Sequence, residues 1–138
     1  MTLIVLYIVT LVVFLAMDAV MLTAVMKPLF ERHIGDLMLA SPDLRPAAIF
    51  YLFYIGGVLW FCAWPALAPG GGGVASAALN GAILGLLAYG TYEFVNISTL
   101  KGWSWRMVAA DTLWGAVLTA GSAAAGVRAV QALGLGRV

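Results

Sequence analysis

The chain carries very little charge for its length. Its 138 residues include seven Lys or Arg and six Asp or Glu, so only 9% are charged. Soluble domains are about 25% charged and about 45–50% apolar, whereas 64% of this sequence is apolar. So few charges cannot cover the surface of a soluble domain, and the same composition excludes disordered, collagen-like and coiled-coil proteins. The composition is typical of an integral membrane protein.

Several kinds of functional site are absent from the sequence as well. The single cysteine, Cys62, has no partner for an internal disulfide, and His33 has no second histidine with which to bind a metal. No zinc-protease motif, nucleophile elbow or phosphate-binding loop is present, because the glycines of residues 69–73 lack a following Lys-Ser or Lys-Thr. The net charge of +1 provides no basic surface, and we therefore expect no nucleic-acid partner.

Four apolar runs are long enough to cross a membrane. A bilayer core requires about 20 apolar residues in one helix. We therefore predict an all-α fold, a four-helix transmembrane bundle that forms a single domain over residues 1–138. Lys27 and Pro28 are expected to end the first helix. The four predicted spans are residues 3–26, 47–67, 75–99 and 107–133.

The first loop is the only sizeable segment outside the predicted spans. Phe30, Ile34, Leu37 and Met38 recur in it at helical spacing, with charged residues between them. This pattern predicts a short amphipathic helix that lies at the membrane interface. A segment of this length is too small to form a catalytic domain.

The loops also predict the orientation of the chain. The first and third loops contain five basic residues and the opposite side contains two, and the positive-inside rule therefore places both termini outside the cytoplasm. Tryptophans mark each membrane interface, as in an aromatic belt. The basic residues of the two loops are Lys27, Arg32, Arg45, Lys101 and Arg106, those opposite are Arg128 and Arg137, and the tryptophans are Trp60, Trp64, Trp103 and Trp105.

Small residues follow one another along the third and fourth spans. Gly81 and Gly85 are four residues apart, and Gly115, Ser122 and Gly126 line the fourth span. Such rows let helices approach closely in lipid, so we expect tight packing within the bundle. Gly- and Ala-rich faces on more than one side also suggest a homodimer as a hypothesis, in addition to the lipid bilayer as a partner.

Three carboxyl groups lie within the predicted spans, where each costs about 2.5–3.5 kcal/mol at the centre of the membrane. They are Asp18, Glu93 and Asp111. At the helical rise of 1.5 Å per residue, they lie about 13, 12 and 8 Å inside the basic residues that border their runs. The antiparallel order of four spans therefore brings all three acids into the same half of the bilayer.

Aromatic and polar side chains are predicted at the same depth, and together they suggest a pocket. Lys101 and Arg106 are the expected charge partners of the acids. A cation held by the carboxylates is the expected ligand, its identity is open, and no other cofactor is evident. The predicted binding pocket consists of Asp18, Tyr51, Tyr54, Tyr89, Glu93, Asn96, Asp111 and Trp114.

Stretches of the chain resemble a family of small bacterial membrane proteins, domain of unknown function 2177. They are residues 50–57 (FYLFYIGG), 89–103 (YGTYEFVNISTLKGW) and 110–115 (ADTLWG), and residues 14–22 resemble the first span of that family. Glu93 stands where the family usually has Asp, and Met21 where it usually has Trp. The resemblance implies the bundle, the polar site and a multi-pass protein of the bacterial inner membrane, with both termini in the periplasm by the positive-inside rule.

The sequence leaves several functions open. The polar groups of the spans could simply satisfy one another. Three acids near only two cations leave negative charge that no positive group compensates. This surplus favours a small transporter that binds a proton, a cation or a small solute. The alternatives are a membrane enzyme or accessory subunit that acts on lipids, and a structural or assembly protein. An enzyme is less favoured, because no nucleophile or His pair is present.

Overall fold

The computed structural model describes residues 1–136, and the regular structure of this part of the chain is entirely helical. Four helices are long and apolar enough to cross a membrane, which confirms the predicted membrane bundle. The predicted second, third and fourth spans begin and end within two residues of these helices, whereas the first helix is longer than predicted. The four helices are Thr2–Leu37, Arg45–Ala66, Gly73–Thr99 and Trp105–Ala132.

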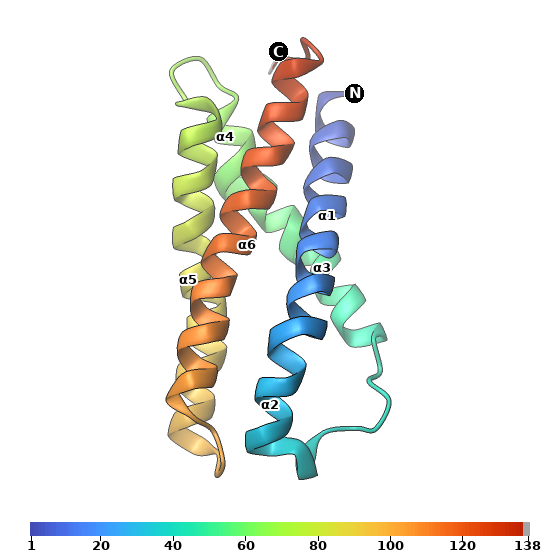
Figure 1. Cartoon of the computed structure of the whole chain (residues 1–138). Coiled ribbons are helices and arrows are strands. Elements are labelled where there is room, and N and C mark those ends of the chain that lie inside the picture. The colour runs from blue at the N-terminus through green and yellow to red at the C-terminus, as the bar shows by residue number, and fades with distance from the viewer. Residues whose placement is uncertain (137–138) are drawn as a thin grey trace.

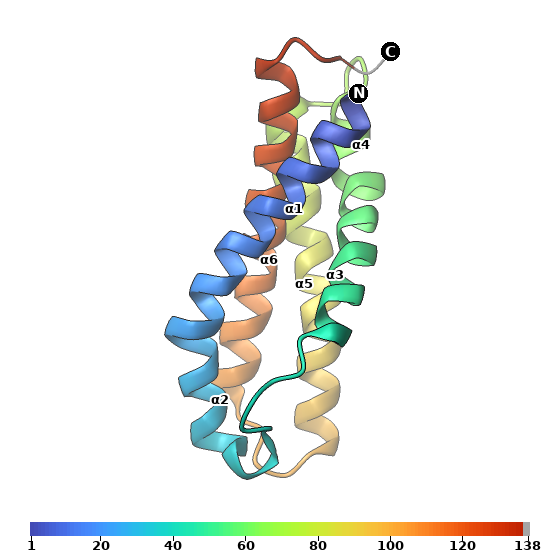
Figure 2. The same ribbon diagram turned by 90° about the vertical axis from the view of Figure 1, so that its right-hand side faces the viewer.

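Helix α6 (Trp105–Ala132) lies at the centre of the bundle (Figure 1). It packs most extensively against α5 (Gly73–Thr99), and α1 (Thr2–Met21) packs on its other side. Helix α3 (Arg45–Val58) runs obliquely behind the other helices in Figure 1, whereas α1 is the oblique helix in the view of Figure 2. Both termini lie at one end of the molecule, and the α5–α6 turn lies at the other. The acids of the predicted site are all in the half nearer this turn.

Glycines allow α5 and α6 to pack backbone against backbone. A Cβ atom on Gly81 would lie 2.8 Å from the carbonyl oxygen of Thr119, and one on Gly85 would overlap the backbone of Gly115. Gly115 in turn leaves the space that the ring of Tyr89 fills. The predicted packing role of this row is therefore confirmed. Because these glycines are covered within the chain, the row offers no surface to a second copy, and a homodimer through other faces stays a prediction.

The first helix does not end at Lys27 and Pro28, as the sequence predicts. After α1 the chain makes one π-helical turn, η1 (Leu22–Met26), and continues directly as α2 (Lys27–Ile34). The amide of Lys27 donates to the carbonyl of Leu22, five residues earlier. Proline lacks a backbone donor and its ring clashes with the preceding turn, and the wider π turn accommodates both effects. The prediction was wrong because a helix can pass a proline in this way.

The same arrangement occurs in the second membrane helix. The π-helical turn η3 (Leu59–Ala63) follows α3 and leads into the short α4 (Trp64–Ala66). The amide of Trp64 donates to the carbonyl of Leu59, and Pro65 follows immediately. Both membrane helices of the first half of the chain therefore contain a π turn directly before an X-Pro pair.

The predicted amphipathic helix of the first loop corresponds to α2. It prolongs the first membrane helix instead of forming a separate interfacial element (Figure 1). Phe30 and Ile34 lie on this helix and are partly buried. The next predicted apolar position, Leu37, belongs to a 3-10 turn, η2 (Gly35–Leu37), and is 72% exposed. The chain is extended at Met38, so the helix ends earlier than the apolar pattern suggests.

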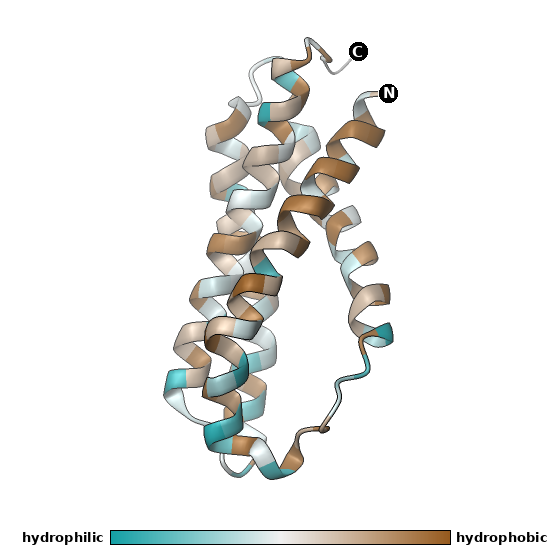
Figure 3. Cartoon of the chain, turned by 45° about the vertical axis from the view of Figure 1, so that its right-hand side comes forward, coloured by the Kyte–Doolittle hydropathy of each residue, from teal (hydrophilic) through white to brown (hydrophobic). Residues whose placement is uncertain are grey.

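Large apolar side chains cover much of the outer surface. Phe53 is 77% exposed and Trp60 is 73% exposed. Hydrophilic residues gather toward the end that contains α2 and the α5–α6 turn, while the upper part of α1 is strongly hydrophobic (Figure 3). Apolar surface of this extent is unfavourable in water and favourable in hydrocarbon. The surface thus agrees with the four membrane-spanning helices.

Candidate functional site

The three intramembrane acids come from three helices, and Asp111 lies within interaction distance of the other two. Asp18 on α1 is 4% exposed and Glu93 on α5 is fully buried. Asp111, on α6, is partly buried; its carboxyl group lies within hydrogen-bonding range of Glu93 and within electrostatic range of Asp18. The antiparallel packing of α5 on α6 creates this arrangement, because it brings the end of α5 beside the start of α6.

Asp18 is held by two donors from other helices. The hydroxyl of Tyr51 donates to Oδ2 at 2.6 Å, and the indole nitrogen of Trp114 donates to Oδ1 at 3.2 Å. The ring of Phe14 packs edge-on against Tyr51, with 5.1 Å between ring centroids. Both carboxylate oxygens therefore have a donor, which stabilises a buried negative charge. Tyr51 and Trp114, both predicted pocket residues, serve to hold Asp18 in place.

Tyr54 and Tyr89 form the aromatic side of the site. The hydroxyl of Tyr54 shares a 2.8 Å hydrogen bond with Thr119 and not with a carboxylate. Its ring lies 6.2 Å from that of Tyr89, in an edge-on contact. Tyr89 packs on Gly115 and lies within electrostatic range of Asp18 and Asp111. Tyr89 therefore borders the acids, whereas Tyr54 connects α3 to α6 one layer away.

Glu93 has a different environment from Asp18. The indole nitrogen of Trp103, at the α5–α6 turn, donates to its Oε2 at 2.6 Å. Its Oε1 is buried and receives no hydrogen bond from an N–H or hydroxyl group within residues 1–136. The neighbouring group is the carboxyl of Asp111. A carboxyl can donate to another carboxyl only when it carries a proton, so a hydrogen bond between Glu93 and Asp111 would need a proton on one of them.

The predicted cation partners are not in place. Across the described part of the chain the ion pairs are Lys27–Glu31 at 3.9 Å and Asp43–Arg45 at 2.9 Å, both outside the site. Lys101 and Arg106 are exposed and form neither. Their pairing with Glu93 was therefore predicted wrongly. Trp103 takes that position because an indole N–H satisfies a carboxylate without bringing a second charge out of water.

Asn96 pairs with Tyr92, which lies within electrostatic range of Glu93 and Asp111. It lies one turn after Tyr92 on α5, and its side chain is within hydrogen-bonding range of the Tyr92 hydroxyl. Tyr92 is 53% exposed, so this pair faces the outside of the bundle. Of these predicted pocket residues of α5, Tyr89 and Glu93 therefore lie at the acids, and Asn96 is linked to them through Tyr92.

Trp103 belongs to the candidate site, although the sequence pattern predicts a role for it at the membrane interface. It was expected to anchor the membrane interface together with Trp105, which is indeed 66% exposed. A signal was present, because Trp103 closes the stretch of residues 89–103 that carries the family resemblance. Ten residues and a turn separate it from Glu93, so helical spacing alone does not connect the two.

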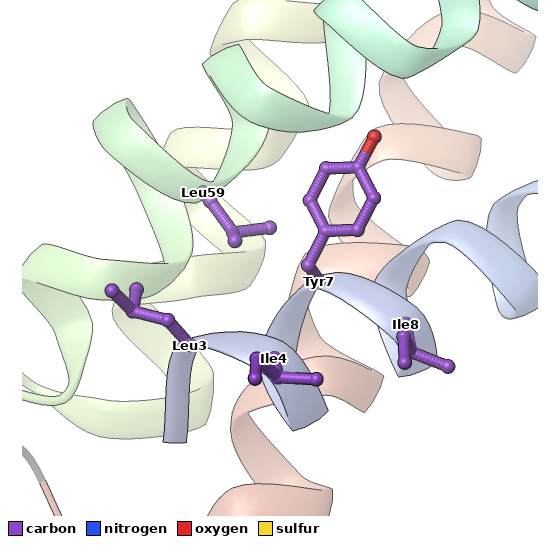
Figure 4. A pocket seen from close by; sticks show the side chains of 5 residues that line it. All are labelled: Leu3, Ile4, Tyr7, Ile8 and Leu59. Atoms are coloured by element: carbon purple, nitrogen blue, oxygen red, sulfur yellow. The ribbon is translucent and has the colours of Figure 1, made fainter. Parts of the chain in front are cut away.

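Two open grooves lie away from the acids. One is an apolar groove of about 380 Å³ between α1 and the second membrane helix, lined by Leu3, Ile4, Tyr7, Ile8 and Leu59 (Figure 4). Another, of about 300 Å³, lies between Cys62 and Asn80. Neither has an acid in its lining. Within residues 1–136, no group of three His, Cys, Asp or Glu side chains is arranged to hold a metal ion.

Comparison with known proteins agrees with this description. No curated protein and no solved structure matches the chain. The sequence family described as "Predicted membrane protein (DUF2177)" matches residues 3–128. This match includes all three acids, Tyr51, Trp103 and Trp114, and covers most of the chain. The chain therefore belongs to the DUF2177 family of membrane proteins.

Proposed function

We propose that the protein is a small transporter that binds a proton at the Glu93–Asp111 carboxyl pair and carries it across the membrane. The observation that carries this proposal is the buried contact between two acids with no cation beside them. Two neighbouring carboxylates in a low-dielectric site do not both ionise. One proton shared by the pair satisfies both groups and leaves a single negative charge.

The hydrogen bonds favour a proton over a metal cation as the ligand. Asp18 already receives a donor on each of its oxygens, which occupies part of its acceptor capacity. Trp103 takes one oxygen of Glu93. A hard cation such as Mg²⁺ or Ca²⁺ requires about six or more oxygen ligands, and the site does not supply them. A proton requires only the two facing carboxyl groups.

Asp18 has a distinct role in this proposal. Both of its oxygens are held by Tyr51 and Trp114, so it takes no part in the proton exchange of the pair. It lies within electrostatic range of Asp111, where a negative charge would favour a protonated pair. Tyr89, which borders both acids, completes the polar environment.

The sidedness of the protein is part of the proposal. The pair lies in the half of the bundle next to the α5–α6 turn and α2. The excess of basic residues in these loops favours the cytoplasm for this side and the periplasm for both termini. We therefore propose that the pair exchanges protons with the cytoplasmic side of a bacterial inner membrane.

A flux experiment in proteoliposomes tests this function. The purified protein is reconstituted with a pH-sensitive dye inside, and a potassium gradient with valinomycin drives proton movement. We expect wild-type flux to exceed that of empty liposomes, and Glu93→Gln and Asp111→Asn to abolish the difference. Asp36→Asn, which removes one exposed acid at the same end of the molecule, is the matched control and retains the flux. Equal flux in the wild type and both site variants would overturn the proposal.

A comparison of cell lipids separates the main alternative. Cells with and without the gene are compared for phospholipid and acyl-chain composition. The transporter proposal predicts the same composition in both. A lipid species that disappears with the gene, and also disappears in cells that carry only Glu93→Gln, would instead support an enzyme or accessory subunit acting on lipids.

A further inference from the structure

Helix α2 packs against Trp103 at the α5–α6 turn. The rings of Phe30 and Trp103 meet edge-on, with 5.5 Å between centroids and an interplanar angle of 75°. One residue before Trp103, a Cβ atom on Gly102 would lie 2.9 Å from the carbonyl oxygen of His33. The chain therefore brings the backbone of α2 directly against the α5–α6 turn, and the glycine makes this approach possible.

Trp103 connects this contact to the acid pair. Its indole nitrogen donates to Glu93 at 2.6 Å, and its ring also meets Tyr92, with 5.8 Å between centroids. The side chain is partly buried between these neighbours. Trp103 therefore contacts both Glu93 and Phe30, and it joins the acid pair to α2.

The attachment of α2 to the rest of the protein is weak. None of its residues is fully buried. Its ion pair, Lys27–Glu31, and the hydrogen bond of His33 to the carbonyl of Leu29 are both internal to the helix. At its other end lies the π turn η1, followed by Pro28. Segments with few buried contacts open at low cost in free energy, and π turns and prolines are where helices bend.

We propose that α2 is a gate, hinged at η1, that opens and closes the access of water to the Glu93–Asp111 pair through Phe30 and Trp103. The inference deepens the proposed function, on which it rests, by naming the element that controls proton exchange. In the closed state described above, Phe30 holds Trp103 on Glu93. When α2 bends outward, Trp103 loses its cover and the carboxyl pair meets water.

A chemical test of access uses a water-soluble carbodiimide, which adds to carboxyl groups that it can reach. The modification of Glu93 is followed by mass spectrometry of the full-length protein in proteoliposomes. Phe30→Ala is expected to speed this modification about tenfold, because it raises the population of the open state. Gly102→Ala is a second variant: it keeps Phe30 but pushes α2 away, and it should act in the same direction.

The matched control is the other Phe–Trp contact of the same turn. Phe94 and Trp105 meet edge-on at 5.9 Å on the lipid-facing side, so Phe94→Ala removes a similar contact that does not cover Glu93. An unchanged rate in Phe30→Ala and Gly102→Ala, or an equal increase in Phe94→Ala, would overturn the gate. The readout is independent of transport. Normal proton flux with unchanged access would refute the gate alone, whereas no flux with gated access would refute the transport function alone.

Discussion

The indole nitrogen of Trp103 donates a 2.6 Å hydrogen bond to Oε2 of Glu93, across the turn that joins the third and fourth membrane helices. Because Oε1 of Glu93 has no N–H or hydroxyl donor in the described residues, this bond is the principal neutral stabilisation of the buried acid. The same tryptophan is covered by Phe30 of α2. One side chain therefore links the acid pair to the part of the protein that faces water.

Replacing Trp103 tests the strength of this link. Trp103→Phe keeps an aromatic ring but removes the donor, and a buried acceptor left without its donor costs about 1–3 kcal/mol. We therefore expect a lower thermal unfolding midpoint in detergent. Trp105→Phe is the matched control, because Trp105 is 66% exposed and its replacement leaves the acid untouched. Equal midpoints for the two variants would contradict the role of Trp103.

Replacing Tyr51 tests the stabilisation of Asp18. Tyr51→Phe removes the 2.6 Å hydrogen bond to the carboxylate, with an expected loss of about 1–2 kcal/mol in unfolding free energy. Tyr7→Phe is the control, since the Tyr7 hydroxyl donates to the neutral carbonyl of Leu52 at 3.0 Å. Its loss should cost about 0.5 kcal/mol. If Tyr7→Phe were as destabilising as Tyr51→Phe, Asp18 would not depend on its donors.

The proposed shared proton predicts a spectroscopic signature. Infrared spectra at neutral pH should contain the C=O stretching band of a protonated carboxylic acid in the wild-type protein, because a hydrogen bond between Glu93 and Asp111 requires a proton. The double variant Glu93→Gln/Asp111→Asn should lose this band. Asp18→Asn should retain it, since Asp18 is satisfied as a carboxylate. A wild-type spectrum without the band would show that both acids are ionised.

The backbone contact between α5 and α6 predicts a large effect from a single methyl group. Gly85→Ala places a Cβ atom on the backbone of Gly115, and forced overpacking costs about 1–3 kcal/mol, sometimes more. Gly56→Ala is the control, because no atom lies within 4 Å of a Cβ at that position in α3. Unfolding in mixed detergent micelles should separate the two variants clearly. Equal stability would mean that α5 and α6 adjust freely.

The sequence predicts the helices well where composition alone decides them. Long apolar runs require spanning helices, and rows of small residues such as Gly81 and Gly85 require close packing. The sequence-based prediction fails at Pro28, because a proline is compatible both with the end of a helix and with a helix that continues after a π turn. The choice between them depends on the packing of the whole helix against its neighbours.

The candidate site is likewise predictable from the sequence only in part. The depth of the three acids follows from the helical rise, so their common level is predictable. Which donor each acid receives is not, because Trp103 reaches Glu93 through a turn and Tyr54 bonds to Thr119 on another helix. The prediction of Lys101 or Arg106 as partners assumed that a buried carboxyl group is stabilised only by a positive charge. Here neutral aromatic donors stabilise these groups instead.

The two π turns, η1 and η3, lie toward opposite ends of the bundle (Figure 1). By contrast, α5 and α6 are uninterrupted α-helices over their described lengths, and they pack closely against each other at glycines. The protein thus combines one continuous pair of helices with two helices that each contain a π turn, one toward each end of the bundle. Because the two π turns belong to different helices, a bend at one end of the protein would not require a bend at the other.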